Sequence, residues 1–190
     1  MIAAVANNNG IYTSANGGIT WSTQIGAESR SWSSIASSSD GTKLSATVNG
    51  GYIYTSTDSG ATWTEQSDAG TRNWTDIASS SDGTKLAATV DGGYIYTSTD
   101  SGATWTEQTN SGIRLWYSVA SSSDGTKLSA VVNGDYVYTS TDSGATWTAR
   151  VSSGNRYYGS IASSSDGVNL AASAGGPGSI VTSNDSGATW

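Results

Sequence analysis

The chain repeats itself every 42 residues, and this regularity limits its possible folds more than any other feature. Trp32, Trp74, Trp116 and Tyr158 occupy the same slot of successive repeats, 42 residues apart. They are followed by nearly the same segments: SIASSSDGTKL, DIASSSDGTKL, SVASSSDGTKL and SIASSSDGVNL. Repeats of this length, with short strand-like runs and Gly or Asp turns, are typical of stacked β units that bury a shared core.

Within one repeat, four short segments have the pattern of β-strands. In the copy over residues 72–108 we expect strands at 73–79, 85–90, 94–98 and 103–107, because these runs alternate or are rich in β-branched and aromatic residues. The Asp82-Gly83 pair predicts a type I′ hairpin turn. Gly recurs every few residues and no window has a 3.6-residue apolar period, so helix is nearly excluded. Four antiparallel strands with short connections form one blade of a β-propeller.

The predicted fold is all-β: a five-bladed β-propeller of four-stranded antiparallel blades. The second strand begins five times, whereas the first strand occurs only four times. The blade made from the N-terminal strands is therefore expected to lack its innermost strand. We assign residues 1–190 to a single domain, and its repeats span approximately 1–31, 32–73, 74–115, 116–157 and 158–190.

An unfilled inner blade edge exposes unpaired backbone groups and favours association. Three alternatives follow. Another chain supplies the pairing, the sequence is a segment of a longer array, or the ring tolerates a three-stranded blade. We favour a single five-bladed ring, with homo-oligomer formation through the open blade as a further possibility.

The most specific motif lies between the third and fourth strands. Ser56–Trp63 recurs as Ser98–Trp105, Ser140–Trp147 and Ser183–Trp190, and a fifth copy, Ser14–Trp21, has Asn16 in the Asp place. This pattern resembles the Asp-box, S-x-D-x-G-x-T-W, of the bacterial neuraminidase repeat (BNR) family. That family is found in sialidases, sortilin-type receptors and assembly factors of photosynthetic membranes, all of them β-propellers.

The resemblance implies that the box is a folding element away from the active face. An Asp carboxylate can accept N–H bonds across the turn, Gly allows positive φ, and Trp packs beneath. A calcium site is the competing interpretation, but these turns offer too few oxygen ligands. The residues given this structural role are Asp58, Asp100, Asp142, Asp185, Trp63, Trp105, Trp147 and Trp190.

Composition excludes several classes of function. The chain has no Cys and no His, which removes disulfides, thiol nucleophiles and imidazole mechanisms, and we expect no metal and no cofactor. A net charge of −7 disfavours nucleic acid as a partner. No apolar stretch is long enough for membrane insertion, and the N-terminus has no signal-peptide pattern. We favour an extracellular or cell-surface location.

Arginines recur on one predicted face of the propeller. Arg30, Arg72, Arg114 and Arg156 each lie two residues before the aromatic that opens the inner strand. A ring of guanidinium groups around the channel mouth would bind carboxylates and other planar anions. The alternative is structural: each Arg pairs with an acid or carbonyl of a neighbouring blade, with Glu65, Glu107 and Asp68 as candidates, and stacks on Trp.

Aromatic residues complete the candidate ligand-binding set on this face. Aromatic rings beside Asn, Asp and Arg suit neutral or acidic sugars, and repetition would provide several weak sites. The inner-strand aromatics can equally serve packing between blades. The candidates are Trp32, Trp74, Trp116, Tyr158, Tyr52, Tyr94 and Tyr136.

These residues favour a non-catalytic, lectin-like carbohydrate-binding module. The alternative is a structural or engineered repeat scaffold that self-associates through its open blade. A sialidase-like glycosidase is a third possibility, but its active site must be asymmetric and the arginines repeat in every blade. Only residues that break the repeat could then be catalytic: Glu28, Asp76, Tyr117, Asp135 and Arg150. We therefore expect no enzyme activity.

Overall fold

Short antiparallel strands make up most of the computed structural model, which describes residues 1–24, 28–175 and 179–190. Their pairing defines five successive units. Unit one has three strands, β1 (Ile2–Val5), β2 (Ile11–Ser14) and β3 (Ser22–Thr23), and unit five also has three, β16 (Arg156–Ser163), β17 (Leu170–Ala174) and β18 (Ser179–Ser183). Units two and three have four each: β4 (Trp32–Ser37), β5 (Leu44–Gly51), β6 (Ile53–Ser56) and β7 (Thr64–Gln66), then β8 (Arg72–Ser79), β9 (Leu86–Gly93), β10 (Ile95–Ser98) and β11 (Thr106–Gln108). Unit four also has four: β12 (Arg114–Ser121), β13 (Leu128–Asp135), β14 (Val137–Ser140) and β15 (Thr148–Arg150).

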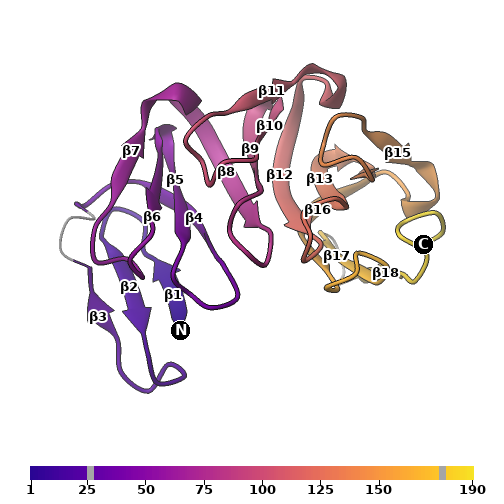
Figure 1. Ribbon diagram of the computed structural model, residues 1–190. Helices are drawn as coiled ribbons and strands as arrows, with labels where there is room; N and C mark the ends of the chain where they lie inside the picture. Colours follow the sequence, from indigo (N-terminus) through magenta and orange to yellow (C-terminus); the bar gives the residue numbers. More distant parts are fainter. Residues whose placement is uncertain (25–27, 176–178) are drawn as a thin grey trace.

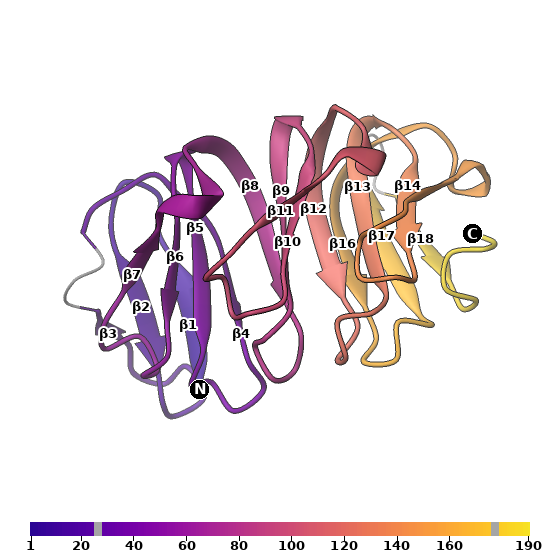
Figure 2. The same cartoon turned by 45° about the horizontal axis from the view of Figure 1, so that its top comes forward.

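The units lie side by side along a curved arc, with unit one at one end and unit five at the other (Figures 1 and 2). Within a unit, consecutive strands pair antiparallel in the same register, so that Leu44 faces Ser56 and Leu86 faces Ser98. Strand β1 has this second-strand register, since Ile2 faces Ser14. The predicted all-β, antiparallel, repeated architecture is confirmed, whereas a ring of five blades with one open blade stays a prediction.

The first strand of a unit connects neighbouring units. The beginning of β8 pairs with the end of β5 in the preceding unit, Arg72 facing Gly51. From Trp74 onward β8 pairs with β9 of its own unit, with a bulge between Trp74 and Asp76. Units four and five repeat this arrangement. The connections between second and third strands therefore lie on the same rim as the arginines.

The apolar core lies in the seams between units. Trp74 packs with Ile77, Val90 and Tyr96 of its own unit and with Ile53 of the preceding unit. Equivalent clusters join Ile11 to Trp32, Ile95 to Trp116, and Val137 to Tyr158. Because the third strand of one unit supplies the apolar residue that covers the aromatic of the next, no unit can bury its core alone.

Two local predictions are wrong in detail. The fourth strand of unit three is Thr106–Gln108 and not 103–107, because Asp100 ties Thr104 into the preceding turn. The connection at Asp82-Gly83 is not a type I′ turn: only Gly83 has positive φ (68°), and the Asp82 carboxylate accepts the Thr84 N–H. Short 3₁₀ turns, η1 (Ser67–Ala69), η2 (Thr109–Ser111) and η3 (Val151–Ser153), also join units two to five.

Candidate ligand-binding site

The arginines lie on one rim, as the repeat predicts, and Arg30, Arg72 and Arg114 are each held over a tyrosine ring of the fold. The Arg72 Nε–H donates to the Ala69 carbonyl (3.1 Å), and its guanidinium lies 4.4 Å from the centroid of the Tyr96 ring. Arg30 and Arg114 lie over Tyr54 and Tyr138 in the same way. Such a cation held over an aromatic ring stabilises the fold and occupies one face of the guanidinium.

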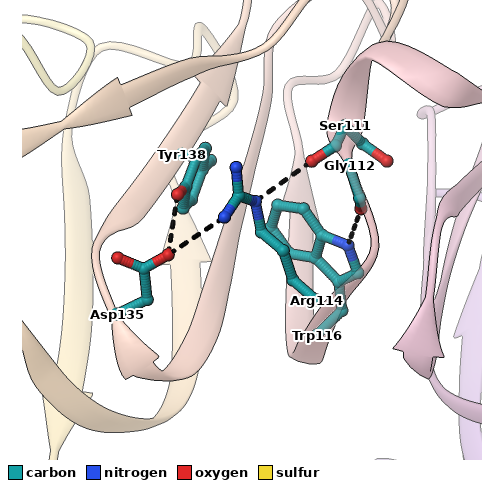
Figure 3. A network of polar contacts seen from close by, with 6 residues as sticks. All are labelled: Ser111, Gly112, Arg114, Trp116, Asp135 and Tyr138. Carbon is teal, nitrogen blue, oxygen red and sulfur yellow. Dashed lines mark hydrogen bonds and ion pairs between the residues drawn. The ribbon is translucent and has the colours of Figure 1, made fainter.

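Unit four shows the network in full (Figure 3). Arg114 donates through Nε to the Ser111 carbonyl (3.2 Å) and forms an ion pair with Asp135 (3.3 Å). Asp135 also accepts the Tyr138 hydroxyl (2.8 Å), while the Trp116 indole N–H donates to Gly112 (3.2 Å). The structural interpretation of these arginines is therefore supported in part, with Tyr and not Trp as the stacking partner.

The acids named as arginine partners bind other groups. Glu65 accepts the Tyr54 hydroxyl (2.5 Å), and Glu107 accepts that of Tyr96. Burial and these bonds raise the pKa of Tyr54 and of Tyr96 to about 12. Asp68 accepts the Trp105 backbone N–H (2.8 Å) and so connects two units.

The inner-strand aromatics do not form a ligand platform in this structure. Trp32 is 3% exposed, Tyr158 1%, and Trp74 and Trp116 0%. The other proposed aromatics, Tyr52, Tyr94 and Tyr136, are half-buried and pack against the seam clusters. The repeated aromatics thus serve packing, because each unit meets its neighbour in the same way.

The carboxylate turns, Ser56–Trp63 and its equivalents, are closed by their own Asp. Asp58 accepts the Ser56 hydroxyl (2.8 Å) and the Thr62 N–H (2.8 Å) through Oδ1, and the Thr62 hydroxyl (2.6 Å) through Oδ2. Bonds from Thr62 and Ser56 lower the Asp58 pKa to about 2. Gly60 has φ of 90°, and Ser59 also adopts positive φ (61°), which the sequence pattern did not predict. The same geometry recurs at Asp100, Asp142 and Asp185.

We expect the protein to lose stability as the pH falls from about 4 to about 2. A carboxylate with a folded-state pKa below its unfolded value of about 3.9 contributes stability above that value and loses it on protonation. The pKa values of Asp58 and Asp185 are about 2, and hydrogen bonds from Thr104 and Thr146 lower those of Asp100 and Asp142. Urea midpoints measured from pH 5 to pH 2 test this expectation.

The fifth turn supplies a matched control. Asn16 Oδ1 accepts the Ser14 hydroxyl (2.9 Å) and the Thr20 N–H (2.9 Å), and Asn16 Nδ2 donates to the Thr20 hydroxyl (2.9 Å). Asn can therefore make the three bonds without a titrating group. A variant with Asp58→Asn, Asp100→Asn, Asp142→Asn and Asp185→Asn should fold and show a shallower acid dependence. If the stability of this variant fell with pH as steeply as that of the wild type, these four carboxylates would not be the origin of the acid sensitivity.

Two of the repeat-breaking residues, Asp135 and Arg150, make the same kinds of contact that other residues make in units two and three. Unit four has Ala149 where Glu65 and Glu107 stand, and Asp135 takes over as acceptor for the tyrosine hydroxyl. Arg150 replaces Gln66 and donates to Thr139 (2.7 Å), as Gln66 does to Thr55 (2.6 Å). These departures preserve the fold and provide no unassigned chemistry.

A second set of departures places large side chains at the surface. Leu115, Tyr117 and Tyr157 are 52%, 50% and 70% exposed on the inner strands of units four and five. Leu115 faces Asp91 across the strand pair, and Tyr157 faces Asn133. The sequence interpretation missed Leu115 and Tyr157 and named Tyr117 only as a catalytic candidate. Comparing equivalent positions of the repeats would have found them. Positions 31, 73, 115 and 157 are equivalent, and the small polar Ser31 and Asn73 are followed there by the large Leu115 and Tyr157.

Neither a membrane span nor a metal site is found in the part of the chain that the structure describes. No helix there is long and apolar enough to cross a bilayer. Over residues 1–24, 28–175 and 179–190, no three acidic, Cys or His side chains gather as a metal site requires. Glu28, another repeat-breaking acid, pairs at the surface with Arg30 (3.1 Å).

The strand pairing, the repeated seams and the arginine-bearing rim define a repeat protein with a β-propeller-like fold. No family model matches the sequence, and no curated protein matches it. Solved structures do: the GH74 enzyme of Niastella koreensis has a TM-score of 0.77 at 19% identity, over 100% of this chain and 29% of that one. YCF48 from Cyanidioschyzon merolae has a TM-score of 0.64 at 20% identity, over 96% of this chain and 63% of that one.

A chain from a nidogen/laminin complex is also similar, with a TM-score of 0.74 at 11% identity, over 94% of this chain and 72% of that one. The chain spans less than a third of the GH74 enzyme and less than two thirds of YCF48. At these identities the likeness concerns the fold alone.

Proposed function

We propose that this chain is a non-catalytic, carbohydrate-binding module built from five Asp-box blades. The ligand lies on the arginine-bearing rim at units four and five and not evenly around all units. The observation that carries the proposal is the exposure of Leu115, Tyr117 and Tyr157. This choice of site departs from the repeated Trp and Arg set, whose side chains are largely committed to packing.

Asymmetry is the reason for assigning these residues to binding. In a repeat protein, a residue needed for folding recurs in each unit because each unit has equivalent neighbours. The slots of Leu115 and Tyr117 hold small polar residues in units two and three: Ser31 and Asn73, and Ser33 and Thr75. Leu115 and Tyr117 leave about half of a large side chain in solvent where the other units have small polar residues. Exposed apolar patches commonly mark binding sites.

The surrounding polar groups suit a sugar. Aromatic side chains present an apolar ring face, and a few placed polar groups provide orientation. Asp91 and Asn133 face Leu115 and Tyr157 on the paired strands. Arg156 is exposed, and within the described residues its one hydrogen bond is from Nε to Ser153 (3.2 Å). Its terminal nitrogens can therefore donate to hydroxyl or carboxylate oxygens.

The partners of the two repeat-breaking aspartates support binding over catalysis. Retaining glycosidases commonly hold two carboxyl groups about 5–5.5 Å apart, one of them as an unengaged nucleophile. Asp135 is held by Tyr138 and Arg114, and Asp76 accepts bonds from Ser34 and Ser118. Among the described residues, both repeat-breaking Asp candidates thus have structural partners.

A glycan array tests the proposal, with xyloglucan oligosaccharides included because one structural neighbour is a GH74 xyloglucanase. We expect Tyr157→Ala and Tyr117→Ala each to weaken binding about tenfold, which corresponds to about 1.4 kcal/mol of lost contact free energy. Thr64→Ala is the control, because Thr64 is exposed on β7 of unit two.

Two results would refute the proposed function. One is silence of the wild-type chain across neutral and acidic glycans. The other is equal loss of binding in the Tyr157→Ala and Thr64→Ala variants. Turnover of fluorogenic glycosides above the buffer rate would instead favour the hydrolase alternative.

A further inference from the structure

Each seam between units is closed by the same turn-on-strand contact. A Cβ on Gly102, in the carboxylate turn of unit three, would lie 2.8 Å from Thr55 Cγ2 of unit two. Gly144 approaches Thr97 to 2.9 Å, and Gly187 approaches Thr139 to 2.9 Å, on the same basis. The turn of one unit therefore fits directly against the third strand of the preceding unit, and only glycine leaves enough space.

Polar bonds reinforce the same seams. The Lys43 ammonium of unit two donates to Ser101 Oγ in unit three (3.2 Å). Lys127 repeats this contact with Ser186 (3.4 Å). Backbone bonds also run from unit to unit, from Ser81 N–H to Ser123 (2.7 Å) and from Ser123 N–H to Ser165 (2.7 Å). The seam is thus a specific, repeated interface and not general apolar contact.

Unit five carries an unfilled half of this interface. A hollow of about 640 Å³ lies there between the unit's own turn, at Thr189 and Trp190, and its strands; its lining includes Asn169, Leu170, Ala171, Thr182, Ser183 and Asn184. Position for position, these correspond to Lys127, Leu128, Ser129, Thr139, Ser140 and Thr141, which line the space left in the seam between units four and five. There the space is only about 10 Å³, because the turn of unit five occupies it.

Exposure shows the same difference. Thr13, Thr55, Thr97 and Thr139 are 9%, 8%, 8% and 4% exposed. Each lies beneath the turn of the following unit and accepts a hydrogen bond from Gln24, Gln66, Gln108 or Arg150 of its own unit. Thr182, the next member of this series, is exposed. The hollow is therefore a preformed seat for one more carboxylate turn.

Unit one carries the other half. Ile2 is 45% exposed, whereas its equivalents Leu44, Leu86 and Leu128 are 1%, 3% and 5% exposed. Trp21, at the end of the turn of this unit, is 44% exposed. The nearest atoms to a Cβ on Gly18 belong to Trp21 and Ile2 of the same unit, and among the described residues no threonine lies within 4 Å of it. The two ends of the arc are thus complementary halves of one seam.

We propose that two copies of this chain associate head to tail, with the Ser14–Trp21 turn of one copy seated on the β17–β18 face of the other. The contact extends the internal seams and places Gly18 against Thr182. Because it joins two different surfaces, it is heterologous, and it leads either to a closed ring of arcs or to a longer assembly. It does not depend on the proposed sugar site.

Light scattering on the purified chain tests this proposal. The wild type should show a mass that rises above 19.3 kDa with concentration. Thr182→Arg blocks the β17–β18 face, and Ile2→Glu blocks the turn-bearing end. Both positions are exposed, and circular dichroism checks that each variant folds. Each variant alone should be a monomer. Mixed in equal amounts they should form a dimer and no larger species, because each retains one intact half.

Val151→Glu, at a residue 65% exposed on the arginine-bearing rim, is the matched control and should associate as the wild type does. A wild type that stays monomeric at all concentrations would overturn the proposal. So would blocked variants that still associate alone, or a mixture of the two that stays monomeric. If two like ends met in a symmetric contact instead, the variant blocked at the other end would still form dimers as the wild type does, and this result would overturn the head-to-tail arrangement.

Discussion

Replacing Trp74 by alanine is expected to lower the free energy of unfolding by about 3–5 kcal/mol. Trp74 is 0% exposed and packs edge-on against Tyr96, with ring centroids 5.2 Å apart. Ile53 of the preceding unit covers it, so the cavity opens in a seam and weakens two units together. Urea unfolding followed by circular dichroism measures the loss.

Unit five supplies the control for this substitution. Tyr158 occupies the equivalent slot at 1% exposure, and its hydroxyl donates to the Ser153 carbonyl (2.7 Å). Trp74→Tyr should therefore be far less damaging than Trp74→Ala, because the ring and a carbonyl partner at Ala69 are both in place. If Trp74→Ala were as stable as the wild type and failed only in glycan binding, Trp74 would belong to a sugar platform after all.

The second large effect is expected at Asp76, whose carboxylate connects three units. It accepts the Ser34 hydroxyl (2.6 Å) from unit two and the Ser118 hydroxyl (2.8 Å) and Val119 N–H (3.0 Å) from unit four. It also accepts the Ile77 N–H (2.9 Å) of its own strand. Asp76→Asn replaces one acceptor oxygen by a donor. In either amide orientation, one backbone N–H then faces a donor, at a cost of about 1–3 kcal/mol.

Asp76→Ser is the informative comparison, because Ser34, Ser118 and Ser160 occupy the same slot. Ser118 Oγ accepts the Ile161 N–H (3.3 Å), so a serine at position 76 can accept the Val119 N–H. We expect Asp76→Ser to stay within about 1 kcal/mol of the wild type and to be more stable than Asp76→Asn. Equal urea midpoints for the two variants would show that the carboxylate does not join the units.

Part of the candidate site was predictable from the sequence. The spacing of 42 residues placed the arginines on one rim, and the structure has Arg72 facing Gly51 there. The prediction of an aromatic platform was wrong for Trp74 and its equivalents, which are buried. Alternation along a strand separates two faces but does not reveal which face a neighbouring unit covers. These rings are buried because the neighbouring unit packs against them, and the pattern within one strand does not reveal that contact.

The sequence by itself determined the local units: antiparallel strands of fixed register, and turns closed by carboxylates such as Asp58 or by the amide of Asn16. Those features depend on residues close together in the chain. Only the tertiary structure decided that Trp74 is core, that Tyr157 faces solvent, and that Thr182 and Ile2 are exposed where their equivalents are buried. Burial depends on what packs against a unit, and identical segments acquire different roles where their neighbours differ.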